Sequence, residues 1–187
     1  VESLDAFTKV AKEDFKEAFR IFNDKSFPLI LEGEDEKIRT LYQGLSKQPV
    51  TYQHVEEFLI ASGKKKPVSI SAKEVGKEYY EVKESARESF YIQRSSWGHL
   101  RLEIETTGDF LEVSRKVVTD DDFIGSYYEV DYLIRKEKLG KGNQFGKITV
   151  KSPYQELVYT IVASTGGKVE VDIRSNQKKH KLDLLRD

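Results

Sequence analysis

The N-terminal third of the chain carries apolar residues at intervals of three and four. Charged residues fill the opposite positions of the first run, so the pattern predicts an amphipathic helix with one buried face, formed by Leu4, Phe7, Ala11, Phe15, Ala18 and Phe22. Pro28 separates this helix from a second one. A third helix is expected between Thr51, a suitable N-cap, and Gly63, a suitable residue past the C-terminal end. We therefore predict a small helical subdomain over residues 1–62.

The spacing of the apolar residues changes to two from about residue 78 onward. Apolar and charged residues alternate strictly over 99–105, and the alternation recurs over 128–135, 147–151 and 169–174. Such alternation is typical of strands with one buried face. Residues 157–163 are apolar in both phases, which predicts a central strand with a partly covered outer face, the helices being the candidate cover.

The strand pattern indicates an immunoglobulin-like β-sandwich. About seven short strands in roughly 100 residues, with turn signals roughly every 8–12 residues, are typical of that architecture. We assign the sandwich to residues 78–176 and a linker to residues 63–77. Residues 177–187 have the pattern of a helix that starts but does not complete an apolar face. The predicted fold class is therefore α+β, a helical subdomain followed by an all-β sandwich.

The amino-acid composition of the chain excludes several classes of function. Ten Phe and ten Tyr among 187 residues are enough for a packed core. The net charge of −1 argues against a nucleic-acid partner, and no apolar run approaches the ~18 residues that a membrane span needs. The absence of Cys excludes disulfides, thiolate metal sites and cysteine nucleophiles. It fits a cytoplasmic location, which we favour, although exported domains also lack Cys. Because the chain begins at Val1 and contains no Met, we expect the natural protein to continue at both ends.

The segment from Leu139 to Ile148 resembles the glycine-rich loop of protein kinases, whose backbone amides cover phosphates. Its glycines fall at 140, 142 and 146, so the interval between the second and third is one residue longer than in the kinase loop. Too few residues follow for the kinase catalytic segments. It is not a P-loop, because Lys147 is followed by Ile148 rather than Ser or Thr. We favour a hairpin loop whose glycines adopt positive φ.

The acidic run Asp120-Asp121-Asp122, with Asp109 nearby, offers the clustered carboxylates that Ca²⁺ prefers. Its spacing matches no EF-hand loop, so we favour a solvated turn in which the aspartates bind their own backbone. His54, His99 and His180 fall in three different elements and form neither a metal-binding pair nor part of a serine-nucleophile motif. We interpret them as surface residues and assign no catalytic, metal-binding or cofactor-binding residue.

Three aromatic residues, Trp97, Tyr127 and Tyr154, are the candidates for a binding surface. Trp97 is the only Trp; it either stacks on a sugar or a partner or, as we favour, caps the sandwich core. Three functions stay open, of which a hydrolase ranks third, because it would need two carboxylates close together in a cleft. The first is a non-enzymatic structural or protein-interaction module, which binds a protein partner or neighbouring domains of the same chain. The second is a carbohydrate-binding module.

Several stretches resemble an uncharacterised family of large bacterial proteins, namely Ser26-Phe27-Pro28, Arg39 to Leu45, Glu56 to Gly63, Ser96-Trp97-Gly98 and Leu139 to Ile148. The resemblance implies a helical and immunoglobulin-like region that precedes a long array of helical repeats. It also implies a helix start at the C-terminal end. The family has no assigned activity, so the resemblance transfers no functional residue.

Overall fold

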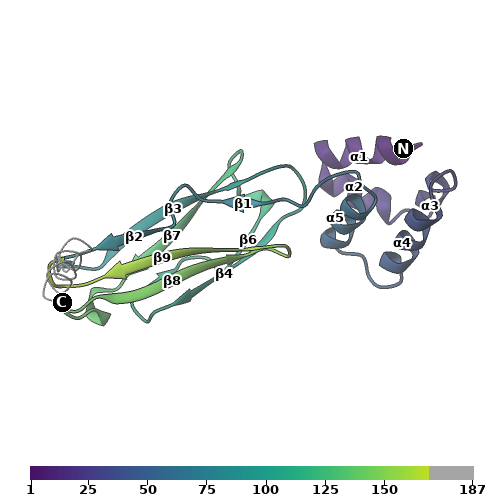
Figure 1. Ribbon diagram of the computed structural model, residues 1–187. Coiled ribbons are helices and arrows are strands. Elements are labelled where there is room, and N and C mark those ends of the chain that lie inside the picture. The colour runs from purple at the N-terminus through teal and green to yellow at the C-terminus, as the bar shows by residue number, and fades with distance from the viewer. Residues whose placement is uncertain (169–187) are drawn as a thin grey trace, which may run out of the picture.

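The computed structural model describes residues 1–168. A helical lobe lies at one end of an elongated molecule, and the remaining described residues form a β domain (Figure 1). The strand predicted over 169–174 and the helix predicted over 177–187 lie outside the described residues.

The helical lobe contains α1 (Leu4–Glu13), α2 (Phe15–Phe22), α3 (Phe27–Ile30), α4 (Glu36–Ser46) and α5 (Tyr52–Ala61). The prediction of one helix through residues 4–22 is wrong, because the chain breaks at Asp14. Asp14 has an extended backbone (φ −151°), and its carboxylate accepts a hydrogen bond from the Glu17 N–H at 3.2 Å. An Asp that caps a new helix in this way competes with continuation of the old one.

The predicted limits of the third helix are confirmed. Thr51 accepts a hydrogen bond from the His54 N–H, and His54 Nδ1 accepts one from the Thr51 N–H, so the two residues form a reciprocal cap at the start of α5. Gly63 adopts φ +78° just past the end of α5, a conformation that favours glycine. Local signals therefore set the ends of α5.

A cluster of aromatic rings forms the centre of the helical lobe. Phe7, Phe22, Phe27 and Phe58 are all buried, and Phe7 and Phe27 meet edge to face with ring centroids 4.9 Å apart. Tyr42 of α4 closes the cluster, 5.2 Å from Phe22. Such pairs stabilise a core by about 0.5–1.5 kcal/mol beyond the apolar area they bury, which helps so small a lobe to hold its shape.

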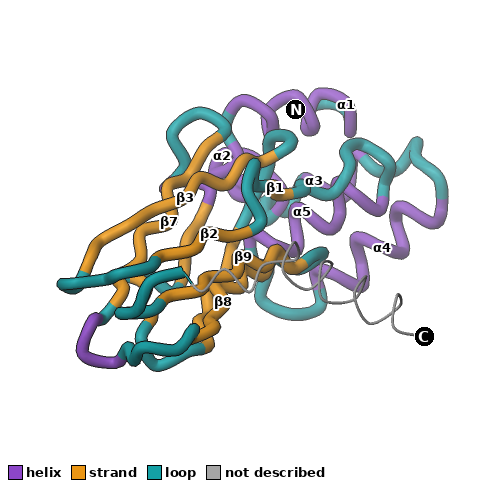
Figure 2. Tube along the Cα trace, turned by 60° about the vertical axis from the view of Figure 1, so that its left-hand side comes forward, coloured by secondary structure: helices purple, strands orange, loops and turns teal. Residues whose placement is uncertain are grey.

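The β domain contains two sheets (Figures 1 and 2). The first has the order β1-β3-β7-β5 and the second the order β2-β9-β8-β4-β6, so residues 1–168 hold nine strands rather than about seven. All neighbouring strands pair antiparallel except β2 and β9, which are parallel. The strands are β1 (Ile70–Ser71), β2 (Gly76–Tyr79), β3 (Ala86–Arg94), β4 (Arg101–Thr107), β5 (Leu111–Val113), β6 (Val117–Thr119), β7 (Tyr127–Ile134), β8 (Gln144–Lys151) and β9 (Glu156–Ala163).

The two sheets face each other across one shared core. Phe90 of β3 stacks on Tyr159 of β9 with ring centroids 3.9 Å apart, which joins the first sheet to the second. The alternating residues that the sequence pattern placed inside are buried, among them Leu102, Val130 and Ile148. Sheet-on-sheet packing therefore produces the period of two.

The prediction that β9 is partly covered by the helices is wrong. Its burial alternates, and Val158 is 45% exposed. The helices lie beyond one end of the sheets rather than over a face (Figure 1). An apolar outer residue in a central strand thus reflects β propensity and neighbouring side chains rather than a covering layer.

The segment assigned to a linker, residues 63–77, contains β1 and the start of β2. Val68 and Ile70 are buried in the core of the β domain. A strand of two residues is too short to show an alternating pattern, which is why the sequence did not reveal it. Among the described residues, the β domain therefore begins earlier in the chain than the pattern indicated.

The glycines of the 140–146 segment do not adopt positive φ, so that expectation is wrong. Gly140 and Gly142 lie in the loop before β8, and Gly146 lies within β8 itself. A Cβ atom on Gly146 would lie 2.8 Å from the Thr107 carbonyl oxygen and 2.6 Å from Leu111 Cδ1. Close approach of neighbouring backbone and side chain, rather than turn geometry, requires glycine at this position.

Replacement of Gly146 by Ala is expected to lower the free energy of unfolding by about 1–3 kcal/mol, because the methyl group overpacks a buried site. Gly142→Ala is the control, since no atom lies within 4 Å of a Cβ at that position. Urea unfolding of both variants measures the difference. Equal stability of the two variants would show that the close packing around Gly146 is wrong.

Candidate functional site

The junction between the helical lobe and the β domain gathers several of the residues that the sequence singled out. Two segments of the β domain lie at this junction, the loop from Arg94 to His99 and the turn between β8 and β9. They face α2, α5 and the loop that follows α5. Two direct contacts mark the ends of this interface. His99 lies against Phe15, and Gln53 Nε2 donates a hydrogen bond to the Tyr154 hydroxyl at 2.9 Å.

A buried ion pair lies at the centre of the junction. Glu56 of α5 and Lys65 are only 1% and 2% exposed at their side chains, and Lys65 Nζ donates to both carboxylate oxygens of Glu56. Lys65 Nζ also donates to the Trp97 carbonyl oxygen at 2.8 Å, which connects the helical lobe to the β domain. The ammonium is 4.7 Å from the centroid of the Trp97 ring, close enough for a cation–π contact.

Burial opposes both charges of this pair. It raises the pKa of Glu56, against the attraction of Lys65, and it lowers the pKa of Lys65, against the attraction of Glu56. Two such charges are tolerated inside a protein only when they pair with each other. The ion pair therefore holds α5, the loop after it and the Trp97 loop in one arrangement.

Trp97 packs on the helical core rather than on the core of the β domain. Arg94 stabilises the loop that carries it, with Nε donating to the Ser96 carbonyl oxygen and Nη2 to the Gly98 carbonyl oxygen, each at 2.7 Å. Gly98 has φ +125°, and a Cβ there would collide with the Glu56 carboxylate and Lys65 Nζ. The loop thus presents Trp97 to the helices, where it is partly buried, instead of to a ligand.

The interpretation of His99 as a surface residue is wrong. Its side chain is 13% exposed, and its ring lies 6.0 Å from the Phe15 ring and 5.7 Å from the Tyr52 ring. His99 Nδ1 is 3.4 Å from Asp120 Oδ1. The pattern of its own strand indicated an outward side chain, but a single strand cannot show that a separate helical lobe covers that position.

The carboxylates of the acidic run accept hydrogen bonds from backbone N–H groups and pair with neighbouring cationic side chains. Asp120 Oδ1 accepts a hydrogen bond from the Leu100 N–H at 3.1 Å, and Asp122 accepts one from the Thr119 N–H and pairs with Arg115 at 2.7 Å. The expected turn, with aspartates bound to nearby backbone, is confirmed as a short 3₁₀ helix over Asp120–Asp122. These carboxylates point to separate partners and do not converge on one point.

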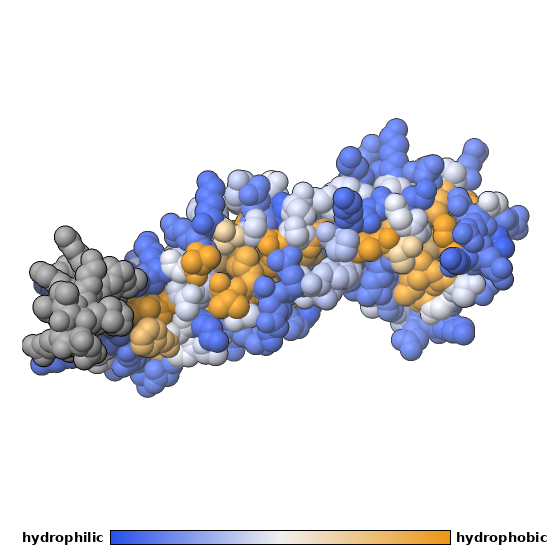
Figure 3. All heavy atoms as spheres, in the orientation of Figure 1, coloured by the Kyte–Doolittle hydropathy of each residue, from blue (hydrophilic) through white to orange (hydrophobic). Residues whose placement is uncertain are grey.

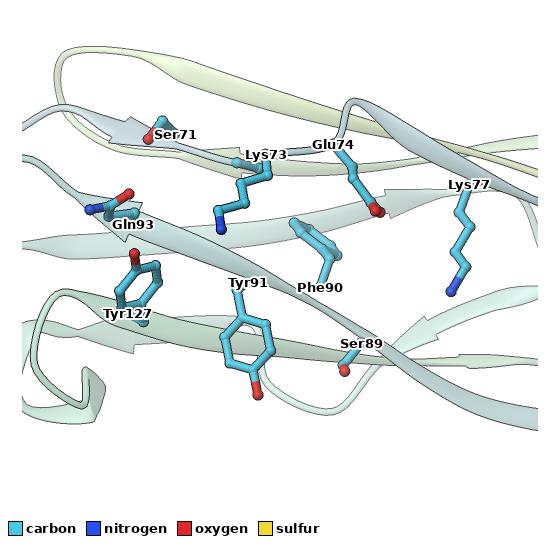
Figure 4. A pocket seen from close by; sticks show the side chains of 10 residues that line it. Ser71, Lys73, Glu74, Lys77, Ser89, Phe90, Tyr91, Gln93 and Tyr127 are labelled. Carbon is cyan, nitrogen blue, oxygen red and sulfur yellow. The ribbon is translucent and has the colours of Figure 1, made fainter.

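A groove lies along β3, away from the junction (Figure 4). It has a volume of about 580 Å³ and separates β3 from the segment that leads out of β1 into β2. Lys73 and Glu74 extend toward it from that segment, and Tyr91 lies on the β3 side. Tyr127 also lines it and is 42% exposed.

The three predicted surface aromatics therefore have different surroundings. Trp97 is part of the junction core, and Tyr154 contacts Gln53 at the rim of the junction while remaining 42% exposed. Tyr127 lines the groove beside β3. Sequence reasoning did not find Glu56, Lys65 or the groove. Lys65 lies in a run of three lysines that looks solvated, and only the fold shows which of the three is buried.

Apolar side chains are also exposed on the outer face of the second sheet, where orange patches are visible in Figure 3. Phe145 of β8 is 70% exposed and Val158 of β9 is 45% exposed. Exposed apolar residues in a cluster are typical of surfaces that contact another protein. No helix in residues 1–168 is long and apolar enough to cross a membrane.

The sequence model of a family described as "Family of unknown function (DUF5717) N-terminal" matches residues 1–186, almost the whole chain. The chain belongs to this family. The predicted membership in an uncharacterised family is thus confirmed, and the family supplies no activity. No curated protein matches the chain.

Solved structures show only distant similarity to this member of the DUF5717 N-terminal family. The ASH / PapD-like domain of human CEP192 (PapD-like domain 7) is 11% identical, with 52% of this chain and 83% of that chain covered and a TM-score of 0.37. An extracellular fragment of EsaA from Streptococcus gallolyticus is 10% identical over 92% of this chain and 46% of that chain, with a TM-score of 0.34.

Loss of the Lys65 charge is expected to destabilise the protein strongly. Lys65→Met leaves Glu56 buried without a partner and should lower the free energy of unfolding by about 3–5 kcal/mol, and Glu56→Met in addition should restore most of it. The control is Lys64→Met. Lys64 pairs with the exposed Asp5, and such a pair contributes at most about 1 kcal/mol. Similar losses for both lysine variants in urea unfolding would contradict a buried Lys65.

Asp120 is expected to make part of the stability of the junction dependent on pH. Burial alone raises the pKa of Asp120, but hydrogen bonds from His99 and from the Leu100 N–H outweigh it and hold the pKa below its usual value. A folded-state pKa below the unfolded value stabilises the protein above the unfolded pKa, and this contribution is lost as the pH falls through the folded pKa.

We therefore expect Asp120→Asn to destabilise the protein by about 1–2 kcal/mol at pH 7 and progressively less as the pH falls below about 3.9, the ordinary pKa of an Asp, measured by denaturant unfolding at each pH. Asp121→Asn is the matched control, because Asp121 is the exposed neighbour in the same run. A deficit for Asp120→Asn that stays constant from pH 7 to pH 2 would refute this role of the carboxylate.

Proposed function

We propose that this chain is a non-enzymatic structural module of a larger bacterial protein. In this role the helical lobe and an immunoglobulin-like sandwich act as one rigid unit that fixes the relative orientation of neighbouring parts of the protein. The resemblance of its motifs to large bacterial proteins with helical repeats supports this context. In the same context the module contacts proteins, either neighbouring domains of its own chain or a separate partner.

One observation carries the proposal, namely the junction formed by Glu56, Lys65 and Trp97. A flexible pair of domains usually meets through a small polar interface. Here a buried ion pair, a hydrogen bond to the Trp97 carbonyl and a half-buried Trp ring connect the two cores. Such a junction opposes bending, because any hinge motion that separates Lys65 from Glu56 leaves a charge unpaired.

The alternative of a carbohydrate-binding module receives less support. Trp97 was its central residue, and Trp97 packs on the helical lobe. Tyr127 and Tyr154 are exposed, but one lines the groove beside β3 and the other contacts Gln53 at the junction. The aromatic platform on which that hypothesis depended is therefore divided between the junction and the groove.

The rigidity of the unit can be measured with spin labels, since the chain has no Cys to interfere. Labels at Thr40→Cys on α4 and Lys147→Cys on β8, both exposed, report the distance between the helical lobe and the β domain. We expect one narrow distance distribution, which broadens when Lys65→Met is added and stays narrow with Lys64→Met. A broad distribution in the doubly labelled chain with Lys65 intact would overturn the proposal.

A further inference from the structure

The outer edge of β3 lacks a strand partner along most of its length. β1 pairs with β3 only at Gln93 and Arg94, after which the chain turns away and joins the other sheet as β2. Over residues 86–92, β3 pairs with β7 on one side, and no strand within residues 1–168 pairs with the other side. The groove of Figure 4 lies beside this edge. An open edge of this length is a ready template for another strand.

The direction of the backbone groups along this edge follows from one hydrogen bond. The Ser95 N–H donates to the Ser69 carbonyl oxygen on the β1 side. Because successive N–H groups of a strand point in opposite directions, the N–H groups of Arg87, Ser89 and Tyr91 point to this same side. These three residues therefore offer the donors and acceptors that an added strand needs.

The open edge is symmetric about Ser89, the middle residue of 86–92. When two copies align their β3 edges antiparallel with Ser89 opposite Ser89, Arg87 of each copy lies opposite Tyr91 of the other. The whole of 86–92 then pairs, and Gln93, which β1 already occupies, stays outside the new pairing. A second copy of β3 thus matches the available edge in length and in hydrogen-bonding pattern.

Charges on the outer face of the first sheet also favour this partner. Arg87 and Glu129 are exposed, and neither forms an ion pair within 4 Å among residues 1–168. Glu129 lies instead beside another acid. Burial and a hydrogen bond with Glu129 raise the pKa of Asp131, and the positive charge of Arg87 opposes only part of this shift. The outer face therefore holds two neighbouring carboxylates whose repulsion Arg87 of the same copy relieves only in part.

The two-fold pairing brings these groups together across the interface. Tyr91 is opposite Glu129 in the register of β3 and β7, so Arg87 of one copy lies two strand spacings, about 10 Å, from Glu129 of the other. The Arg and Glu side chains together bridge that distance over the Tyr91 ring, where a cation–π contact adds to the attraction. The two-fold axis repeats this contact, so each interface contains it twice.

The opposite wall of the groove selects neither an acidic nor a basic segment. Lys73, Glu74 and Lys77 line this wall, so charges of both signs lie along it. Phe90, only 6% exposed, lies between β3 and the wall, so an added strand completes the cover of the core there. The selective charges are therefore those of the outer face, where a second copy supplies the complement.

We propose that two copies of this chain associate through their β3 edges as antiparallel neighbours, related by a two-fold axis at Ser89. The first sheets of the two copies then form one continuous sheet, with a contact between Arg87 and Glu129 on each side of the axis. Because the edge is short, we expect a dimer in equilibrium with the monomer rather than a permanent one. The inference goes beyond the proposed function and is independent of it, since edge pairing requires no rigid junction.

Sedimentation equilibrium of the full chain over a range of protein concentrations tests the inference. We expect a reversible dimer whose dissociation constant rises at least about tenfold in Arg87→Glu and in Glu129→Arg, because each change brings like charges together twice. The double variant Arg87→Glu with Glu129→Arg should regain most of the lost affinity, since it restores the pair with reversed sign. Lys147→Glu, a reversal of charge at an exposed position of β8, is the control and should leave the dissociation constant unaltered.

Disulfide trapping gives a second measurement in a chain without Cys. Ser89→Cys should form a covalent dimer rapidly, because Cα atoms directly opposite in such a pair lie about 5.5 Å apart, within the range of a disulfide. Ser114→Cys, at an exposed serine next to β5 on the other edge of the same sheet, should do so much more slowly.

A chain that sediments as a monomer at every concentration would overturn the inference. So would equal trapping of the two Cys variants, or a loss of affinity in Arg87→Glu that the double variant does not recover. A dimer that Phe145→Asp abolishes and Arg87→Glu leaves intact would assign the contact to the outer face of the second sheet instead.

Discussion

The buried pair of Glu56 and Lys65 is the constraint on which the arrangement of this molecule depends. Each side chain is almost inaccessible to water, so each requires the other. Lys65 follows α5, and its ammonium donates to the Trp97 carbonyl of the β domain, so this residue connects the two separate hydrophobic cores. Gly98 permits the approach, because any side chain there would displace the pair.

The same constraint explains why the residues most suggestive of ligand binding are structural. Trp97 and His99 are large and partly polar, and both lie in the loop that leads into β4. In an isolated sandwich such residues would be exposed at one end. Here Phe15 and Tyr52 cover His99, and Trp97 packs on the helical core. The surfaces that stay open are the edge of β3 and the outer face of β8 and β9, and both are better suited to protein segments than to small molecules.

The sequence predicted what depends on local periodicity. It located α5 between Thr51 and Gly63, and it located the strands around Ile104, Val130 and Ile148, because capping residues and alternation act within a few positions. It missed the break at Asp14, since the apolar spacing continues across it. It also missed β1, which is too short to alternate.

The junction and the groove depend on contacts between distant parts of the chain, and no local pattern encodes them. Glu56 and Trp97 are separated by forty positions, and the buried Lys65 is flanked by two lysines of the same type. The groove begins beside Tyr91 because β1 pairs with β3 only at Gln93 and Arg94, and this pairing exists only in the folded chain. The signal available for the junction was a Gly directly after the only Trp, a place where close approach of another chain segment is common.

Residual dipolar couplings of backbone amides, measured on the full chain in one aligning medium, test the central claim most directly. If the Glu56–Lys65 junction makes one rigid body, a single alignment tensor fits the couplings of residues 4–61 and of residues 70–163 together. Two tensors of clearly different magnitude, one for the helices and one for the strands, would show that the lobes reorient independently and would contradict the account.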